Sequence, residues 1–186
     1  ERAATHFEPA ICAESVVETV FEFTMDRLRG YYLDQGVRPD ALEAVLDCRP
    51  TRPLDFDRRV RAVSAFLEQT EAFSLAATNK RIRNLLKKVE TVLPLEVCSE
   101  LLIEEAEQAL ARRLVELSSE AIQLMENGLY GEALNQLMHL REPVDAFFDQ
   151  VLVMANDPVL RDNRIALLNE LSSLFLRVAD FSRLRD

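Results

Sequence analysis

The sequence is short of the residues that most catalytic and metal-binding motifs require. It contains four glycines, two histidines, three cysteines and no tryptophan among its 186 residues. A phosphate-binding loop needs closely spaced glycines, and a Cys/His metal site needs ligands at short spacings that His6 and His139 do not provide. No serine lies in a Gly-x-Ser-x-Gly turn. These absences favour a binding module over an enzyme, so we expect no catalytic residue, metal ligand or cofactor in this chain.

Cysteine and long apolar runs are scarce as well. Cys12, Cys48 and Cys98 are odd in number and far apart in the sequence, which is typical of reduced thiols in a cytoplasmic protein. No apolar run reaches the roughly 18 residues that a membrane span needs, and no signal peptide is recognisable. The chain starts at Glu1 rather than at a methionine. We therefore expect a piece of a longer cytoplasmic protein that does not bind a membrane.

Lysine is the scarcest of the charged residues, and its placement is uneven. All three lysines, Lys80, Lys87 and Lys88, lie within residues 79–88. The chain carries 22 basic and 32 acidic residues, a net charge of −10. Residues 51–90 hold 9 basic and 5 acidic residues, whereas residues 91–186 hold 8 and 17. An acidic protein repels polyanions in general, so this basic segment indicates either one oriented contact with a polyanion or a solvated helix face.

The basic segment has the periodicity of an amphipathic helix. Ile82, Leu85, Leu86 and Val89 follow the i, i+3, i+4, i+7 spacing of one apolar stripe. Six polar side chains fall opposite this stripe or beside it: Lys80, Asn84, Lys87, Arg83, Arg81 and Lys88. The pattern predicts a helix that packs by a narrow apolar edge and presents a broad cationic surface to solvent.

The rest of the chain also favours helix, because Leu, Ala, Glu and Arg dominate and no strand alternation is present. Gly36, Gly128 and the prolines at 39, 53, 94, 143 and 158 punctuate the helical patterns. We expect helices over about 14–36, 39–48, 55–68, 72–93, 99–126, 129–140, 143–155 and 159–181. The predicted architecture is an all-α bundle of about seven or eight helices.

Some of these helices carry more specific expectations. The first is predicted to bury a wide apolar face that includes Val16, Val17, Val20 and Phe23. Asp55 or Asp57 is expected to cap the helix that follows Pro53. On the helix over 99–126, Glu104, Glu105 and Glu107 are assigned to the solvated side.

The segment Arg49–Pro53, which is bracketed by prolines, marks the best domain boundary. It divides the chain into a connecting helical segment, 1–53, and a helical domain, 54–186. Arg58 and Arg61 point away from the apolar stripe of their own helix. If that helix and the one with the lysines are antiparallel neighbours, their basic faces merge into one patch.

The chain resembles the C-terminal region of the β subunit of bacterial-type heterotetrameric glycyl-tRNA synthetase. The likeness rests on residues 26–36 (DRLRGYYLDQG), 55–63 (DFDRRVRAV), 79–88 (NKRIRNLLKK) and 143–149 (PVDAFFD), and continues through 153–154, 161–164 and 179–180. The order and spacing of these stretches are more specific than any one of them. The resemblance implies an α-helical anticodon-binding domain of the type shared with arginyl-tRNA synthetase. It also implies glycine tRNA and a catalytic α subunit as partners, with ATP used by the whole enzyme.

The resemblance and the charge pattern converge on the helix around Lys80. Lysine and arginine neutralise the phosphates of an anticodon loop, and asparagine can hydrogen-bond base edges. We therefore expect Lys80, Arg81, Arg83, Lys87 and Lys88 to contact phosphates, Asn79 and Asn84 to meet base edges, and Arg58 and Arg61 to extend the cationic face. DNA is not an expected partner. The alternative is a helical protein–protein docking module in which residues 79–88 meet an acidic partner.

Overall fold

The computed structural model of the protein describes residues 14–89 and 96–184, and these residues form helices without any strand. The helices are α1 (Glu14–Asp34), α2 (Pro39–Leu46), α3 (Pro53–Phe66), α4 (Thr70–Leu86), α5 (Glu105–Glu126), α6 (Tyr130–Met138), α7 (Arg141–Gln150) and α8 (Pro158–Leu176). Two short 3₁₀ turns, η2 (Ser99–Leu101) and η3 (Phe181–Arg183), complete the described part. The prediction of an all-α fold with seven or eight helices is confirmed.

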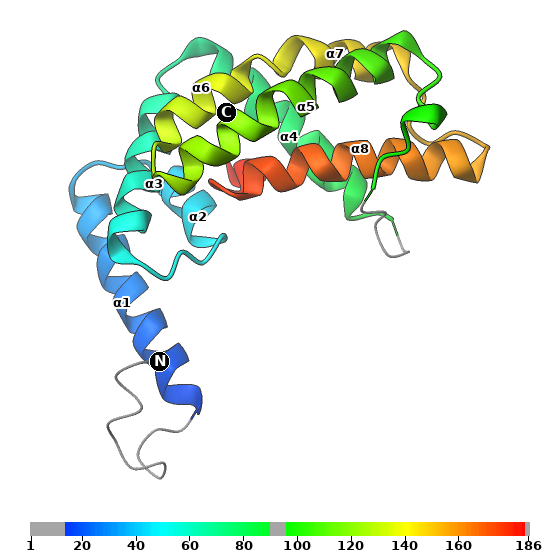
Figure 1. Cartoon of the computed structure of the whole chain (residues 1–186). Coiled ribbons are helices and arrows are strands. Elements are labelled where there is room, and N and C mark those ends of the chain that lie inside the picture. Colours follow the sequence, from blue (N-terminus) through cyan, green and yellow to red (C-terminus); the bar gives the residue numbers. More distant parts are fainter. Residues whose placement is uncertain (1–13, 90–95, 185–186) are drawn as a thin grey trace.

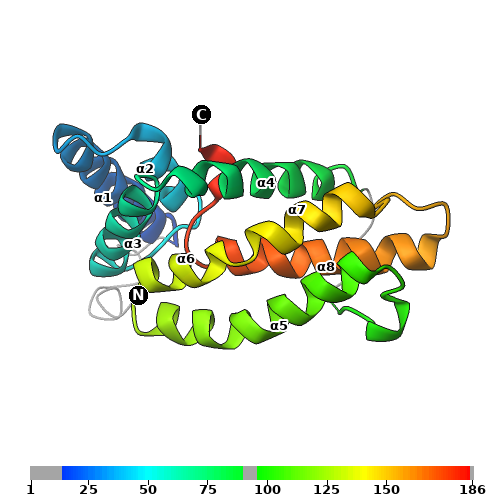
Figure 2. The same cartoon turned by 90° about the horizontal axis from the view of Figure 1, so that it is seen from above.

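The longer helices form an elongated bundle (Figures 1 and 2). α6 and α7 follow one another along α5, and α8 packs against both α4 and α5. α2, α3 and η3 gather at one end of this bundle, where α3 contacts α6 and α4 contacts η3. α1 packs on α2 and projects away from the body (Figure 1).

Glycine and proline set several helix limits, as the sequence predicts. Gly36 follows α1 with φ +82° and Gly128 follows α5 with φ +72°, values that side-chain-bearing residues rarely adopt. Pro39, Pro53 and Pro158 each stand at the first position of a helix. The predicted stop at Pro94 lies outside the described residues.

Several predicted helix ends are wrong. α5 begins at Glu105 rather than at 99, and α7 spans Arg141–Gln150 rather than 143–155. α3 begins at Pro53, ahead of both proposed caps, and the residue before it makes no side-chain cap. Asp55 and Asp57 instead bind side chains within and beyond the first turn. α8 ends at Leu176 rather than near Phe181, because the chain turns there and the Asp180 N–H donates to the carbonyl of Ala44 (2.8 Å).

Residues before and after the predicted boundary at 53/54 share one core. Leu42 on α2, Phe56 on α3 and Phe181 on η3 are all fully buried in the same apolar cluster. The Cys48 thiol donates to the carbonyl of Leu176 (3.2 Å), and burial raises the pKa of that thiol to about 11. The division into two domains stays a prediction, while α2 packs as part of the bundle.

The predicted apolar face of α1 is only partly buried. Met25 and Tyr32 are buried, but Val16, Val17, Val20 and Phe23 are exposed. Their positions on the projecting half of the helix explain the difference, since α2 contacts only part of α1. The prediction that these four side chains face the core is therefore wrong.

Glu107 is also misassigned by the sequence, because it is completely buried. Its Oε1 accepts from Arg164 Nη2 (2.5 Å) and Nε (3.1 Å) and from the Glu104 N–H (3.3 Å). Arg164 in turn donates to the carbonyl of Leu152 (2.9 Å), which holds the loop between α7 and α8. This buried pair ties α5, α8 and that loop together.

Candidate nucleic-acid interface

The second half of α4 presents a cationic groove. Lys80, Arg81 and Asn84 are exposed on this helix and Lys88 just after it, while Ile82 and Leu86 are buried, as the periodicity predicts. The groove has a volume of about 560 Å³, and its remaining walls are apolar: Ala77, Leu85, Val89 and Met154. The charged ends of the lysine and arginine side chains lie beside apolar lining residues. Such a groove suits a ligand that combines charged groups with flat apolar faces.

One wall of the groove is organised by an aromatic ring. The Arg81 guanidinium lies 4.1 Å from the centroid of the Phe148 ring. Stacking of this kind fixes the plane of a guanidinium and leaves its other face free. Phe147, the neighbouring ring, is fully buried in the core. Of these two neighbouring phenylalanines, Phe147 thus belongs to the core and Phe148 supports a residue that lines the groove.

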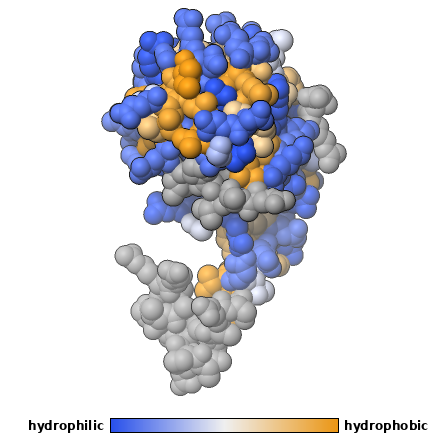
Figure 3. All heavy atoms as spheres, turned by 90° about the vertical axis from the view of Figure 1, so that its right-hand side faces the viewer, coloured by the Kyte–Doolittle hydropathy of each residue, from blue (hydrophilic) through white to orange (hydrophobic). Residues whose placement is uncertain are grey.

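Met154 is a residue of the groove that the sequence analysis did not select as a contact residue. It lies in the loop between α7 and α8, is 55% exposed, and borders the groove on α4. Leu152 and Val159 flank the same turn and are also exposed, and apolar side chains gather among polar ones on this end of the bundle (Figure 3). No pattern local to α4 indicates this contact, because the two segments are about seventy residues apart.

Two of the predicted contact residues on α4 do not share the exposed face. Asn79 is buried, with 3% of its surface exposed, and its Nδ2 has no hydrogen-bond partner among the described residues. Arg83 lies at the edge of the stripe, where its Nη2 pairs with Asp180 Oδ2 (3.2 Å). Burial raises the pKa of Asp180, but hydrogen bonds from Ser182 and the nearby Arg83 outweigh it and hold that pKa below its usual value.

Arg58 and Arg61 lie apart from the α4 groove. α3 packs on α2 and α6, whereas α4 packs mainly on η3 and α8 and less closely on α7 and α6, so the two basic helices are not an antiparallel pair. The condition for one merged basic face is therefore not met, and the role of Arg58 and Arg61 in RNA binding stays a prediction. Arg61 donates through Nε to Asp57 Oδ1 (2.9 Å), and Asp57 also accepts from the Tyr32 hydroxyl (2.5 Å). The Arg61 and Tyr32 hydrogen bonds lower the pKa of Asp57, while burial and the Asp57 bond raise that of Tyr32.

Most arginines are already neutralised by this acidic chain. Eleven of them pair with carboxylates within the described part of the protein. Nine cations in residues 14–89 and 96–184 form no ion pair with another residue described there. They are Arg27, Arg52, Arg58, Lys80, Arg81, Lys87, Lys88, Arg112 and Arg177. Four of the nine belong to α4 or the residues directly after it, which makes this helix the richest source of unneutralised positive charge.

Two other classes of site find no support in the described segments. No group of three His, Cys, Asp and Glu side chains comes close enough there to hold a metal ion. Among the helices of these segments, none is both long and apolar enough to pass through a bilayer.

Similarity to known proteins agrees with this geometry. The chain is 50% identical to the glycine–tRNA ligase beta subunit of Aeromonas hydrophila over 100% of its own length and 27% of that protein. It is 47% identical to the corresponding subunit of Pasteurella multocida (100% and 27%) and 48% identical to that of Vibrio parahaemolyticus (99% and 27%). The chain thus spans about a quarter of these relatives. Residues 75–178, which include every residue of the α4 groove, match the model of the DALR anticodon binding domain, and the chain belongs to that family.

Proposed function

We propose that the α4 groove binds the anticodon arm of glycine tRNA and thereby positions the tRNA for aminoacylation by a catalytic α subunit. The observation that carries this proposal is the position of the groove within the matched anticodon-binding segment, together with its unpaired cations. Activation of glycine with ATP takes place outside this chain, which contributes RNA binding.

The groove offers the three kinds of contact that a single-stranded RNA loop uses. Lys80 and Lys88 neutralise phosphates as mobile point charges. Asn84 presents an amide to a base edge. A base stacks on the free face of the Arg81 guanidinium, with Met154 beside it as an apolar contact. Lys87 is exposed directly after α4 and adds a further phosphate contact.

The test compares two charge reversals in the intact synthetase that contains this domain. K80E/K88E inverts the charge of the groove and leaves the buried stripe of α4 untouched. R27E/R112E is the matched control, because it changes the net charge equally at two exposed arginines that are likewise unpaired within residues 14–89 and 96–184. We expect K80E/K88E to lower kcat/KM for tRNA by about tenfold to a hundredfold for each lysine–phosphate bond that is removed, on the basis of ~1.5–3 kcal/mol for a hydrogen bond to a charged group.

Formation of glycyl-adenylate without tRNA separates the two possible roles of the groove. It stays near the wild-type rate if α4 contacts RNA. Loss of adenylate formation together with aminoacylation indicates instead that α4 docks onto another protein and holds the subunits together. A folded K80E/K88E enzyme that charges tRNA like the control leaves the groove without a role in either process.

A further inference from the structure

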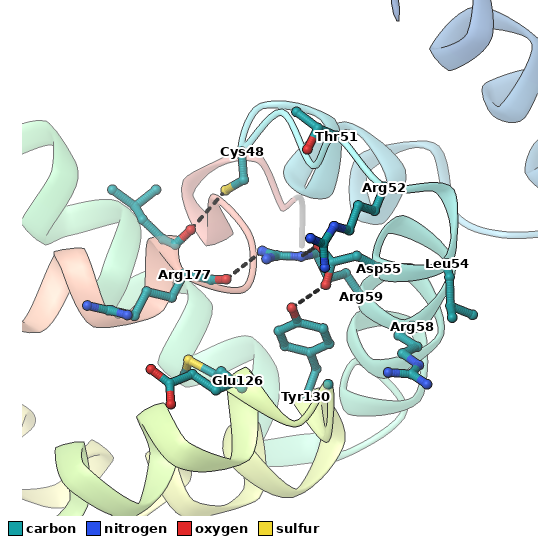
Figure 4. A pocket seen from close by; sticks show the side chains of 13 residues that line it. Cys48, Thr51, Arg52, Leu54, Asp55, Arg58, Arg59, Glu126, Tyr130 and Arg177 are labelled. Carbon is teal, nitrogen blue, oxygen red and sulfur yellow. Dashed lines mark hydrogen bonds and ion pairs between the residues drawn. The ribbon is translucent and has the colours of Figure 1, made fainter. Parts of the chain in front are cut away.

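We propose that the cleft between the start of α3, the α5–α6 turn and the end of α8 is a second anion site, which binds a phosphate group. The cleft has a volume of about 600 Å³ (Figure 4). It shares no lining residue with the α4 groove, and Arg52, Arg58 and Arg59 lie before the matched segment 75–178. The inference therefore goes beyond the proposed function and does not depend on it.

Two cations without a carboxylate partner in the described segments, Arg52 and Arg58, line this cleft. Arg58 lies on α3 and Arg52 directly before it. Arg177 borders the cleft after α8, but its side chain points away from the other labelled residues (Figure 4). Glu126 is the one exposed carboxylate of the lining that opposes them. In an acidic protein that pairs most of its arginines, two such arginines beside one cleft leave a local excess of positive charge.

The floor of the cleft is hydrogen-bonded, and its charges are already paired. Arg59 donates through Nε to Asp55 (2.8 Å) and through Nη1 to the carbonyls of Arg177 and Val178, and its guanidinium lies 4.6 Å from the centroid of the Tyr130 ring. The Tyr130 hydroxyl donates to Asp55, and burial together with this bond raises the pKa of Tyr130 to about 12. Asp55 is thus held by Arg59 and Tyr130. Figure 4 shows Arg52 reaching toward this cluster.

Gly128 makes room for Arg58 at the edge of the cleft. A Cβ on Gly128 would lie 2.4 Å from Arg58 Nη1 and 3.2 Å from Arg58 Cδ. Any other residue at this position would push the Arg58 side chain aside. The positive φ of the α5–α6 turn and the placement of a cation thus depend on the same glycine.

Helix polarity adds to the positive potential of the cleft. α3 and α6 both begin beside it, and neither receives a side-chain cap from its N-cap residue. Their first N–H groups leave the positive ends of two helix dipoles at the cleft. The C-terminal end of α8 would oppose them, but Arg59 donates to the carbonyls of Arg177 and Val178 there.

The two cationic sites lie at opposite ends of α8. Met154 borders the α4 groove just before α8 starts, and Leu176 borders the cleft where α8 ends. Nineteen helical residues separate these ends by on the order of 25–30 Å. One phosphate therefore cannot occupy both sites, so the cleft takes either a second phosphate of a bound RNA or a small free phosphate.

The test measures binding of inorganic phosphate to the folded chain through the NMR signals of arginine Nε–Hε groups. We expect saturable shifts and at least about tenfold weaker binding in R52Q/R58Q. R27Q/R112Q, which removes equal charge from other exposed arginines, should change binding less than about twofold. Glu126→Gln should tighten binding several-fold, because it removes the opposing carboxylate. A gain of this kind does not arise from a misfolded variant.

A short RNA hairpin then distinguishes the two sources of phosphate. If R52Q/R58Q weakens binding of the hairpin as well, the phosphate belongs to an RNA backbone; if only inorganic phosphate binding falls, it belongs to a small ligand. Absence of saturable phosphate binding by the wild-type chain would overturn the proposal. So would equal weakening by R52Q/R58Q and R27Q/R112Q, or no gain from Glu126→Gln.

Discussion

The α4 groove and the Glu107–Arg164 pair use charge in opposite ways. In the groove, Lys80, Arg81 and Lys88 are exposed and without carboxylate partners in the described part of the chain. Between α5 and α8, Glu107 and Arg164 are paired, with side chains 0% and 6% exposed. A buried pair fixes the relative placement of its helices, whereas unpaired surface cations contribute little to the fold and remain available to a ligand. The same residue types thus stabilise one region and equip the other for binding.

Truncating Glu107 should have the largest effect on stability. Glu107→Ala leaves the Arg164 guanidinium buried without its counter-ion, and breaking such a pair costs about 3–5 kcal/mol. Urea denaturation followed by circular dichroism at 222 nm measures this decrease. The control Glu105→Ala, two residues away and exposed, should change the free energy of unfolding by less than about 0.5 kcal/mol. Equal effects of the two substitutions would place Glu107 on the solvated face after all.

The next largest effect should come from the contact between α4 and the C-terminal turn. Asp180→Asn removes the charge that pairs with Arg83 and weakens the bonds from the Ser182 N–H (3.0 Å) and hydroxyl (2.6 Å). We expect the free energy of unfolding to fall by about 1–3 kcal/mol at pH 7. Asp149→Asn, at an exposed carboxylate, serves as the control.

The pH dependence of this effect has a defined sign. The pKa of Asp180 is lower in the folded state than its usual value, so its ionised form stabilises the fold above that usual value, and the contribution is lost as pH falls through the folded pKa. The difference in unfolding free energy between wild type and Asp180→Asn should therefore be constant from pH 7 to 5 and shrink below about pH 4. A difference that grows on acidification would contradict the assignment.

A smaller effect on stability is expected from substitution of Phe148, the ring that packs against Arg81. Phe148→Leu keeps much of the apolar volume but removes the ring face beneath Arg81, a contact worth about 0.5–1 kcal/mol at an exposed site. The substitution should lower stability by about 1 kcal/mol and should weaken binding of an RNA hairpin, because the plane of Arg81 is no longer fixed. Arg81→Gln should weaken RNA binding to a similar extent. Additive effects in the double variant would show that the two side chains act separately.

What the sequence predicts well is local, and what it misses depends on distant segments. Gly36, Gly128 and Pro158 limit helices through their own backbone preferences, and the α4 stripe follows from a period of 3.6 residues. The burial of Glu107 depends on Arg164, 57 residues further on, and the helical period alone placed it on the solvated side.

The residues of the candidate site also fall into those that a local pattern predicts and those that depend on distant segments. Lys80, Arg81 and Lys88 could be chosen from their helix alone. Met154 reaches the groove through the α7–α8 loop, and Asn79 is absent from the exposed face because other helices cover it. The separation of Arg58 from α4 likewise depends on how α3 packs against α6, which no local pattern encodes.

The smallest effect on stability should come from substitution of the three lysines. Glu107 and the lysines then differ most clearly, because one substitution should lower stability and the other RNA binding. K80Q/K87Q/K88Q should alter the free energy of unfolding by less than about 0.5 kcal/mol, because these side chains are exposed and form no ion pair within residues 14–89 and 96–184. RNA binding should respond strongly to the same substitutions.

About four phosphate contacts predict a slope of log K against log salt near −3, at roughly −0.7 per phosphate of single-stranded RNA. Removal of three cations should reduce the magnitude of this slope by about 2. Glu107→Ala, measured in urea-free buffer at a temperature where it is folded, should keep the wild-type slope despite its lower stability. If the lysine variant instead became less stable and kept the slope, the α4 cations would belong to the fold and the groove would not be the site of phosphate contact.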